Sequence, residues 1–163
     1  MNANKIKKQV RCWVILFIIA LALSGITAIP LKGELAYLMN QKEFFTEAMN
    51  GWIERVYTGI TETDAAYPFI AYGTDWLAFA HVVIALLFIG VLKDPVKNKW
   101  IIDWAIMCCI LILPVAFIFG PIRDIPMFHI LLDCSFGIVG IIPLMIVKNK
   151  IRLLETISGN NPD

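Results

Sequence analysis

The sequence is poor in charge for a chain of its length. Only 17% of its 163 residues are charged, compared with about 25% in an ordinary soluble domain. The formal net charge is +1, so the chain lacks the basic surplus typical of nucleic-acid-binding proteins. It also lacks the polar, low-complexity composition of disordered chains. A soluble globular domain, a nucleic-acid-binding module and a disordered protein are therefore all disfavoured.

Cysteine and histidine are scarce as well, and they form no familiar catalytic motif. The cysteines lack the C-x-x-C spacing of thiol–disulfide relays, so they are interpreted as small packing residues. The motifs H-E-x-x-H, G-x-S-x-G and Walker A are missing, as is the histidine-rich cluster that a membrane di-iron hydroxylase needs. The usual signatures of hydrolases and ATPases are therefore absent. The four cysteines are Cys12, Cys108, Cys109 and Cys134.

Hydrophobic residues, in contrast, make up 59% of the chain, and they gather in four long runs. A helix needs about 20 apolar residues to cross the hydrocarbon core of a bilayer. The runs cover residues 12–29, 68–92, 100–120 and 127–147, and none of them contains Lys or Arg, as expected where a buried basic side chain is costly. The sequence predicts an all-α fold: one membrane domain over residues 1–163, forming an integral membrane four-helix bundle.

Basic residues outside the four runs indicate the orientation. Ten of the 14 lie before the first run, between the second and third, or after the fourth. The others, Lys32, Lys42, Arg55 and Arg123, lie in the first and third loops. Because the cytoplasmic segments of membrane proteins carry an excess of Lys and Arg, the sequence predicts cytoplasmic termini and external first and third loops.

The first run has a second interpretation, as a cleaved signal peptide. A basic start precedes it, and Ile26-Thr27-Ala28 is an acceptable cleavage site. The run is longer than the apolar core of a signal peptide, which has about 7–15 residues, and this length favours a retained span. Either interpretation leaves the other three orientations unchanged.

The long first loop contains an amphipathic segment, predicted to be a helix outside the membrane over about residues 43–61. Its apolar residues recur at helical spacing, while Arg55 and several glutamates occupy the other face. Asn50-Gly51 is a point at which this helix can break in two. Helices that grip an anionic lipid surface are rich in Lys and Arg, whereas this one is acidic, so we expect it to rest over the outer mouth of the bundle. The apolar positions are Phe45, Ala48, Met49, Trp52, Ile53, Val56, Tyr57 and Ile60.

A few ionisable residues interrupt the apolar runs. With a rise of about 1.5 Å per residue, Asp75, His129 and Asp133 fall at a similar depth in the outer half, and the last two share a helix face because they are four apart. Such a group suits a cation, a proton or a small polar substrate, and it is a partial ligand set for Zn²⁺, Mn²⁺ or Fe²⁺. Arg123 lies in the outer hairpin, where it can guide an anion or pair with Asp124 or Asp133.

These polar residues also have a structural interpretation, which stays open. Asp75 and Asp133 can hydrogen-bond Tyr, Trp, Ser or His on neighbouring helices and so fix their packing. Asp103 lies near the cytoplasmic interface, within reach of water, Lys97 or Lys99. It needs no role in a site.

Two histidines in a four-helix membrane bundle raise the question of a haem. The two axial ligands of a haem must meet one iron, but the depths of His81 and His129 differ by roughly 10 Å. This difference disfavours a haem. His81 is better interpreted as a hydrogen-bonded histidine of the polar core.

Three segments carry a resemblance to other proteins: Tyr72–His81, Gly120–Arg123 and Asp133–Gly137. Together they resemble a group of small bacterial four-span membrane proteins of unassigned function. The resemblance implies a bacterial inner-membrane setting and no particular activity.

The leading hypothesis from the sequence is an outward-opening pocket lined by Asp75, His129 and Asp133, with the 43–61 helix as its lid. A non-enzymatic subunit, which docks a membrane partner or a second copy through the acidic outer helix, is one alternative. An enzyme acting on a lipid or quinone at the outer leaflet, with His129 as proton donor or acceptor, is another.

Overall fold

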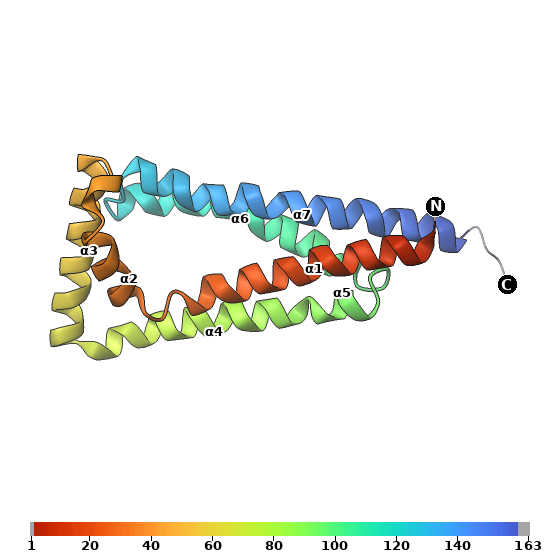
Figure 1. The fold of residues 1–163 in the computed structure, drawn as a ribbon, viewed down its shortest axis with the longest axis horizontal. Coiled ribbons are helices and arrows are strands. Elements are labelled where there is room, and N and C mark those ends of the chain that lie inside the picture. Colours follow the sequence, from red (N-terminus) through yellow and green to blue (C-terminus); the bar gives the residue numbers. More distant parts are fainter. Residues whose placement is uncertain (1, 160–163) are drawn as a thin grey trace. The chain divides into compact units, whose positions relative to one another are not determined.

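The computed structural model describes residues 2–159, and the described chain is 87% helical, with no strand. The long helices are α1 (Ala3–Ile26), α3 (Glu47–Ala66), α4 (Ala71–Leu87), α6 (Lys99–Ile122) and α7 (Met127–Gly159). The short ones are α2 (Leu31–Met39), α5 (Ile89–Lys93) and two 3-10 turns, η1 (Lys42–Phe44) and η2 (Pro68–Ile70). Figure 1 shows these elements along the chain.

Four helical stretches are long and apolar enough to cross a membrane. They are Ala3–Ile26, Pro68–Lys93, Lys99–Ile122 and Met127–Ile157. Most of their apolar side chains are exposed, since only 11–28% of the most apolar part of each stretch is buried within the protein. A water-soluble monomer rarely exposes so much apolar surface. The prediction of four apolar, membrane-spanning helices is therefore confirmed at the level of length and composition.

The first and last helices extend beyond the apolar runs seen in the sequence. α1 begins at Ala3 rather than near Cys12, and α7 continues past Val147 to Gly159. The extensions keep the helical repeat of apolar residues: Ile6 in α1, and Ile151 and Leu154 in α7, are all buried. Lys and Arg are good helix formers, so the basic residues that end the apolar runs do not end the helices.

The chain divides into two compact units, where the sequence predicts a single domain. Unit 1 comprises Met1–Ala20 and Ala85–Asp163, and unit 2 comprises Leu21–Ile84. The divisions fall inside α1 and α4. Each unit is described by itself below.

In unit 1, α6 and α7 pack side by side along their length (Figure 1). A Cβ atom added at Gly137 of α7 would stand 2.6 Å from the backbone oxygen of Cys109 in α6, so the two backbones approach closely at this point. α1 and α5 complete the core of the unit. Its buried residues are Ile6, Val10, Val14, Ala85, Phe88, Val91, Ile101, Ile102, Ala105, Ile130, Cys134, Leu144, Val147, Ile151 and Leu154.

α6 ends in a tight, hydrogen-bonded turn that leads into α7. The amides of Asp124 and Ile125 donate to the carbonyl oxygens of Pro121 and Gly120, at 3.2 and 3.0 Å. This pattern is a Schellman motif, whose residue just past the helix takes a left-handed conformation. Asp124 occupies that place with a φ of 54°, which Asp tolerates better than most residues do.

Unit 2 contains the end of α1, the segment up to η2, and most of α4. A Cβ atom added at Gly25 of α1 would lie 2.5 Å from Cβ of His81 and 2.8 Å from the carbonyl oxygen of Ala78. The backbone of α1 therefore approaches α4 closely at this point. α2 packs against α3 (Figure 1), and Leu35 of α2 is buried.

The segment 43–61, where the sequence predicts a helix, contains the end of η1 and most of α3. The hydroxyl of Thr46 caps α3 by accepting a hydrogen bond from the amide of Met49 at 3.3 Å. The helix continues through Asn50-Gly51 without a break and ends at Ala66, because Tyr67 precedes a proline and the α conformation is disfavoured there. α2 was not anticipated from the sequence.

Candidate functional site

Asp75 lies on α4 in unit 2, and its side chain is exposed. Within the part of the chain that the structure describes, it makes no hydrogen bond or ion pair. Aromatic rings surround it along the helix: Tyr72 meets Trp76 edge-on with ring centroids 5.9 Å apart, and Trp76 meets Phe79 at 5.6 Å. An aspartate in an apolar span is costly without a partner. Asp75 is therefore the described carboxylate most in need of a ligand.

Asp75 lines a cavity of about 450 Å³ that lies wholly within unit 2. The turn after α1, the start of α2, the C-terminal part of α3, η2 and the start of α4 form its walls. This volume lies in the range of small-molecule sites, about 300–1,000 Å³, which are mostly apolar with a few polar groups. Thr63, Tyr67 and Thr74 are among the residues that line this cavity.

One ion pair joins two described residues of the cavity lining. Nζ of Lys32 on α2 donates to Oδ2 of Asp64 on α3 at 2.9 Å. The hydrogen bond and the charge of Asp64 raise the pKa of Lys32 above its usual value. Because these two charges offset each other, the cavity lining carries one uncompensated negative charge, the carboxylate of Asp75.

His129 and Asp133 lie one turn apart on α7 in unit 1. The distance from Nε2 of His129 to Oδ1 of Asp133 is 3.9 Å, and the side chains are 37% and 44% exposed. The expectation that the two residues share a face of one helix is confirmed. Such a pair can share or pass on a proton when the imidazole is protonated.

The predicted grouping of Asp75 with His129 and Asp133 combines residues of both units, and it stays a prediction. Within either unit, the described residues include no cluster of three or more His, Cys, Asp and Glu side chains placed to hold a metal ion. The predicted metal ligand set therefore gains no support from either unit alone.

His81 makes a polar contact within its own helix, and Arg123 lies at the end of a helix. Nδ1 of His81 lies 2.8 Å from the carbonyl oxygen of Leu77, one turn earlier in α4. Arg123 is exposed at the end of α6, and in the described chain no ion pair joins it to Asp124 or Asp133.

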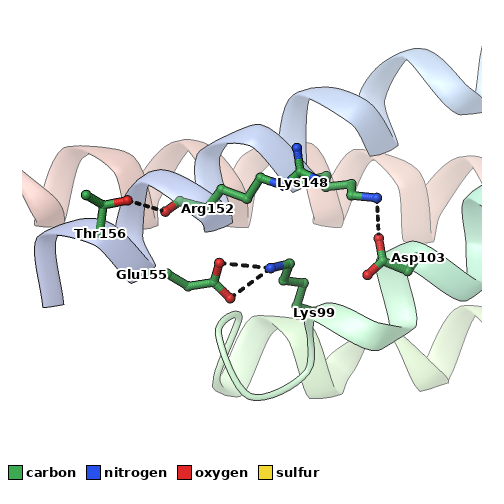
Figure 2. A network of polar contacts seen from close by, with 6 residues as sticks. All are labelled: Lys99, Asp103, Lys148, Arg152, Glu155 and Thr156. Atoms are coloured by element: carbon green, nitrogen blue, oxygen red, sulfur yellow. Dashed lines mark hydrogen bonds and ion pairs between the residues drawn. The ribbon is translucent and has the colours of Figure 1, made fainter. Parts of the chain in front are cut away.

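Asp103 belongs to a set of contacts between α6 and α7 that Figure 2 shows. Nζ of Lys148 forms an ion pair with Oδ1 of Asp103 at 2.6 Å. Nζ of Lys99 reaches both carboxylate oxygens of Glu155, at 3.0 and 2.9 Å. The acid therefore pairs with a lysine of the next helix and not with Lys97 or Lys99, the partners considered from the sequence.

Sequence reasoning missed several residues that shape the unit 2 cavity. Lys32 and Asp64 are far apart along the chain, and no motif links them. The apolar repeat of the outer loop pointed to a helix, but it did not indicate that Thr63 and Asp64 line a cavity. An ion pair between distant surface residues leaves no signal in a single sequence.

No family model matches the chain, and neither the curated proteins nor the solved structures include one with significant similarity to it.

Proposed function

We propose that the chain is a multi-pass protein of a bacterial inner membrane that binds a small organic cation at Asp75. In this proposal both termini are cytoplasmic and the first and third loops are external. The excess of basic residues at the termini and in the second loop supports this orientation. α2 and α3 then cover the external end of α4, and the cavity opens on that side.

One observation carries the proposal. The carboxylate of Asp75 lines the cavity and has no partner among the described residues, whereas the other two charged residues of the lining, Lys32 and Asp64, neutralise each other. A cavity of about 450 Å³ is much larger than a bare metal ion needs. A protonated amine can pair with Asp75, place its apolar part against Ile60 and Ile70, and contact the ring of Tyr67 through a cation–π interaction. The substrate class is therefore a small amphiphilic amine.

The test is binding of protonated amines to the purified protein in mild detergent. Ethanolamine, choline and a longer alkylamine are titrated calorimetrically, with the matching neutral alcohols as comparison ligands. We expect Asp75→Asn to abolish amine binding, because Asp75 is the only uncompensated charge among the described residues that line the cavity. Glu62→Gln is the matched control, since Glu62 is an exposed acid of α3 that does not line the cavity. Unchanged amine binding by Asp75→Asn would exclude the proposal.

The grouping of Asp75 with His129 and Asp133 that the sequence predicts is a separate proposal and has its own test. Protein purified without chelator is analysed for metal content. Near-stoichiometric zinc or manganese that is lost in Asp133→Ala but kept in Asp124→Ala would support a shared metal site. Metal-free protein that binds amines would restrict the site to unit 2.

A second function, a non-enzymatic subunit of a membrane complex, is favoured by the aromatic face around Asp75. Tyr72, Asp75, Trp76 and Phe79 line a shallow groove of about 250 Å³ on α4. A basic residue on a partner helix would satisfy the carboxylate there. Cross-linking in native membranes distinguishes the two functions, because a stoichiometric partner lost in Asp75→Asn indicates a subunit.

A further inference from the structure

A second and larger cavity lies in unit 1, separate from the Asp75 cavity. Its volume is about 780 Å³, and residues from the start of α1, from α5 and the turn after it, and from α7 line it. Four of the lining residues are basic, and one is acidic. The basic residues are Lys7, Lys8, Arg11 and Lys93.

Asp94, the acidic residue that lines this cavity, already interacts with Lys97. Oδ1 of Asp94 accepts a hydrogen bond from the amide of Lys97 at 3.1 Å, and its Oδ2 lies 3.8 Å from Nζ of the same lysine. The four basic residues that line the cavity form no ion pair or hydrogen bond through their side chains with any described residue. They are thus available to an anion.

Other lysines of unit 1 differ in this respect. Lys99 and Lys148 are paired with the carboxylates of Glu155 and Asp103, and Nζ of Lys150 donates to Oε1 of Gln9 at 2.7 Å. Lys5, Arg123 and Arg152 of unit 1 also have no described side-chain partner, but the four unpaired basic residues of the cavity share one lining. Their mutual repulsion there is unfavourable unless an anion lies between them.

The cavity also has an apolar floor. Val10, Val91 and Leu154 line it, and each of the three is at most 2% exposed. A ligand that fits combines a negatively charged group for the basic rim with a hydrocarbon part for the floor. Phosphate suits the rim because Arg11 can bind two of its oxygens at once and the lysines act as point charges.

We propose that this cavity binds the phosphate group of an anionic phospholipid, with the glycerol and the first acyl carbons against the apolar floor. The basic residues lie where the apolar parts of α1 and α5 end, which is the level of lipid headgroups in a bilayer. Basic pockets at such positions bind acidic headgroups in other membrane proteins. This site is independent of the proposed amine site in unit 2.

Native mass spectrometry of the detergent-purified protein tests the proposal, with phosphatidylglycerol and phosphatidylcholine of equal chain length as probes. The double variant Lys8→Gln/Arg11→Gln removes two charges from the cavity rim. Each basic residue near a lipid surface contributes about 1 kcal/mol, so we expect retention of phosphatidylglycerol to weaken about 30-fold. Lys5→Gln/Arg152→Gln is the matched control, because it removes the same charge from exposed residues of α1 and α7 that do not line the cavity.

Retention of phosphatidylglycerol over phosphatidylcholine, lost in the cavity variant and kept in the control, would support the proposal. Equal losses in the two variants, or equal retention of the two lipids, would overturn it. A third arm adds soluble glycerol phosphate as a competitor. If this compound binds as tightly as the lipid, the source is a free phosphate and the lipid assignment is wrong. The exposed positions of all four substituted residues allow folding, which thermal unfolding of each variant checks.

Discussion

Lys148 on α7 and Asp103 on α6 form an ion pair, with Nζ 2.6 Å from Oδ1 (Figure 2). The side chains are 22% and 45% exposed, so the pair is only partly shielded from its surroundings. The contact gives a structural reason for an acid at the edge of an apolar helix. It also ties together the two helices that form the main packing of unit 1.

Removing this pair is expected to destabilise unit 1 modestly. Asp103→Asn and Lys148→Met should each lower the free energy of unfolding by about 1 kcal/mol, because each removes an ion pair that is only partly screened by its surroundings. Denaturant unfolding in detergent, carried out as a double-mutant cycle, measures the coupling. Lys97→Met is the control, since Lys97 is 84% exposed in its pair with Asp94. Strictly additive losses would show that the two charges do not interact.

Gly137→Ala is expected to force α6 and α7 apart. The added methyl group would stand 2.6 Å from the carbonyl oxygen of Cys109, a backbone atom that cannot rotate away. Overpacking of this kind costs about 1–3 kcal/mol, which a lowered thermal unfolding midpoint would reveal. Gly33→Ala serves as the comparison, because nothing lies within 4 Å of its added Cβ and Ala favours a helix. A wild-type midpoint for Gly137→Ala would contradict the close approach of the two helices.

Asp124 should tolerate glycine but not a β-branched residue. Its φ of 54° lies in the left-handed region, which costs an ordinary L-residue about 1–2 kcal/mol. Asp124→Gly should therefore unfold at or slightly above the wild-type denaturant concentration, and Asp124→Val below it. Similar midpoints for the two variants would mean that the Schellman turn does not form.

The link between α2 and α3 should weaken in alkaline solution. Asp64 raises the pKa of Lys32 above 10.5 through a hydrogen bond and its charge. A raised pKa in the folded state means that the stabilisation is complete below the unfolded pKa and is lost as pH rises through the folded one. Thermal unfolding from about pH 8 to about pH 11.5 should show this alkaline loss in the wild type.

Lys32→Gln is expected to reduce that alkaline loss, because it removes the titrating group. Lys42→Gln is the control: Lys42 approaches Glu54 only to 3.6 Å, and no hydrogen bond between them accompanies the ion pair. An unchanged pH profile in Lys32→Gln would assign the alkaline loss to other groups.

The amino-acid sequence alone determined the four apolar helices. A run of about 20 apolar residues in hydrocarbon can satisfy its backbone hydrogen bonds only within itself, which requires a helix. It also determined the shared face of His129 and Asp133, since residues four apart on one helix lie together whatever surrounds them.

Only the tertiary structure decided which helix faces meet. Helices that are apolar all round have no polar side to indicate their rotation, because lipid and a neighbouring helix are equally apolar surroundings. The pairing of Asp103 with Lys148, the pairing of Lys32 with Asp64, and the two cavities all depend on that rotation. They became visible only when helices distant in the sequence were packed together within each unit.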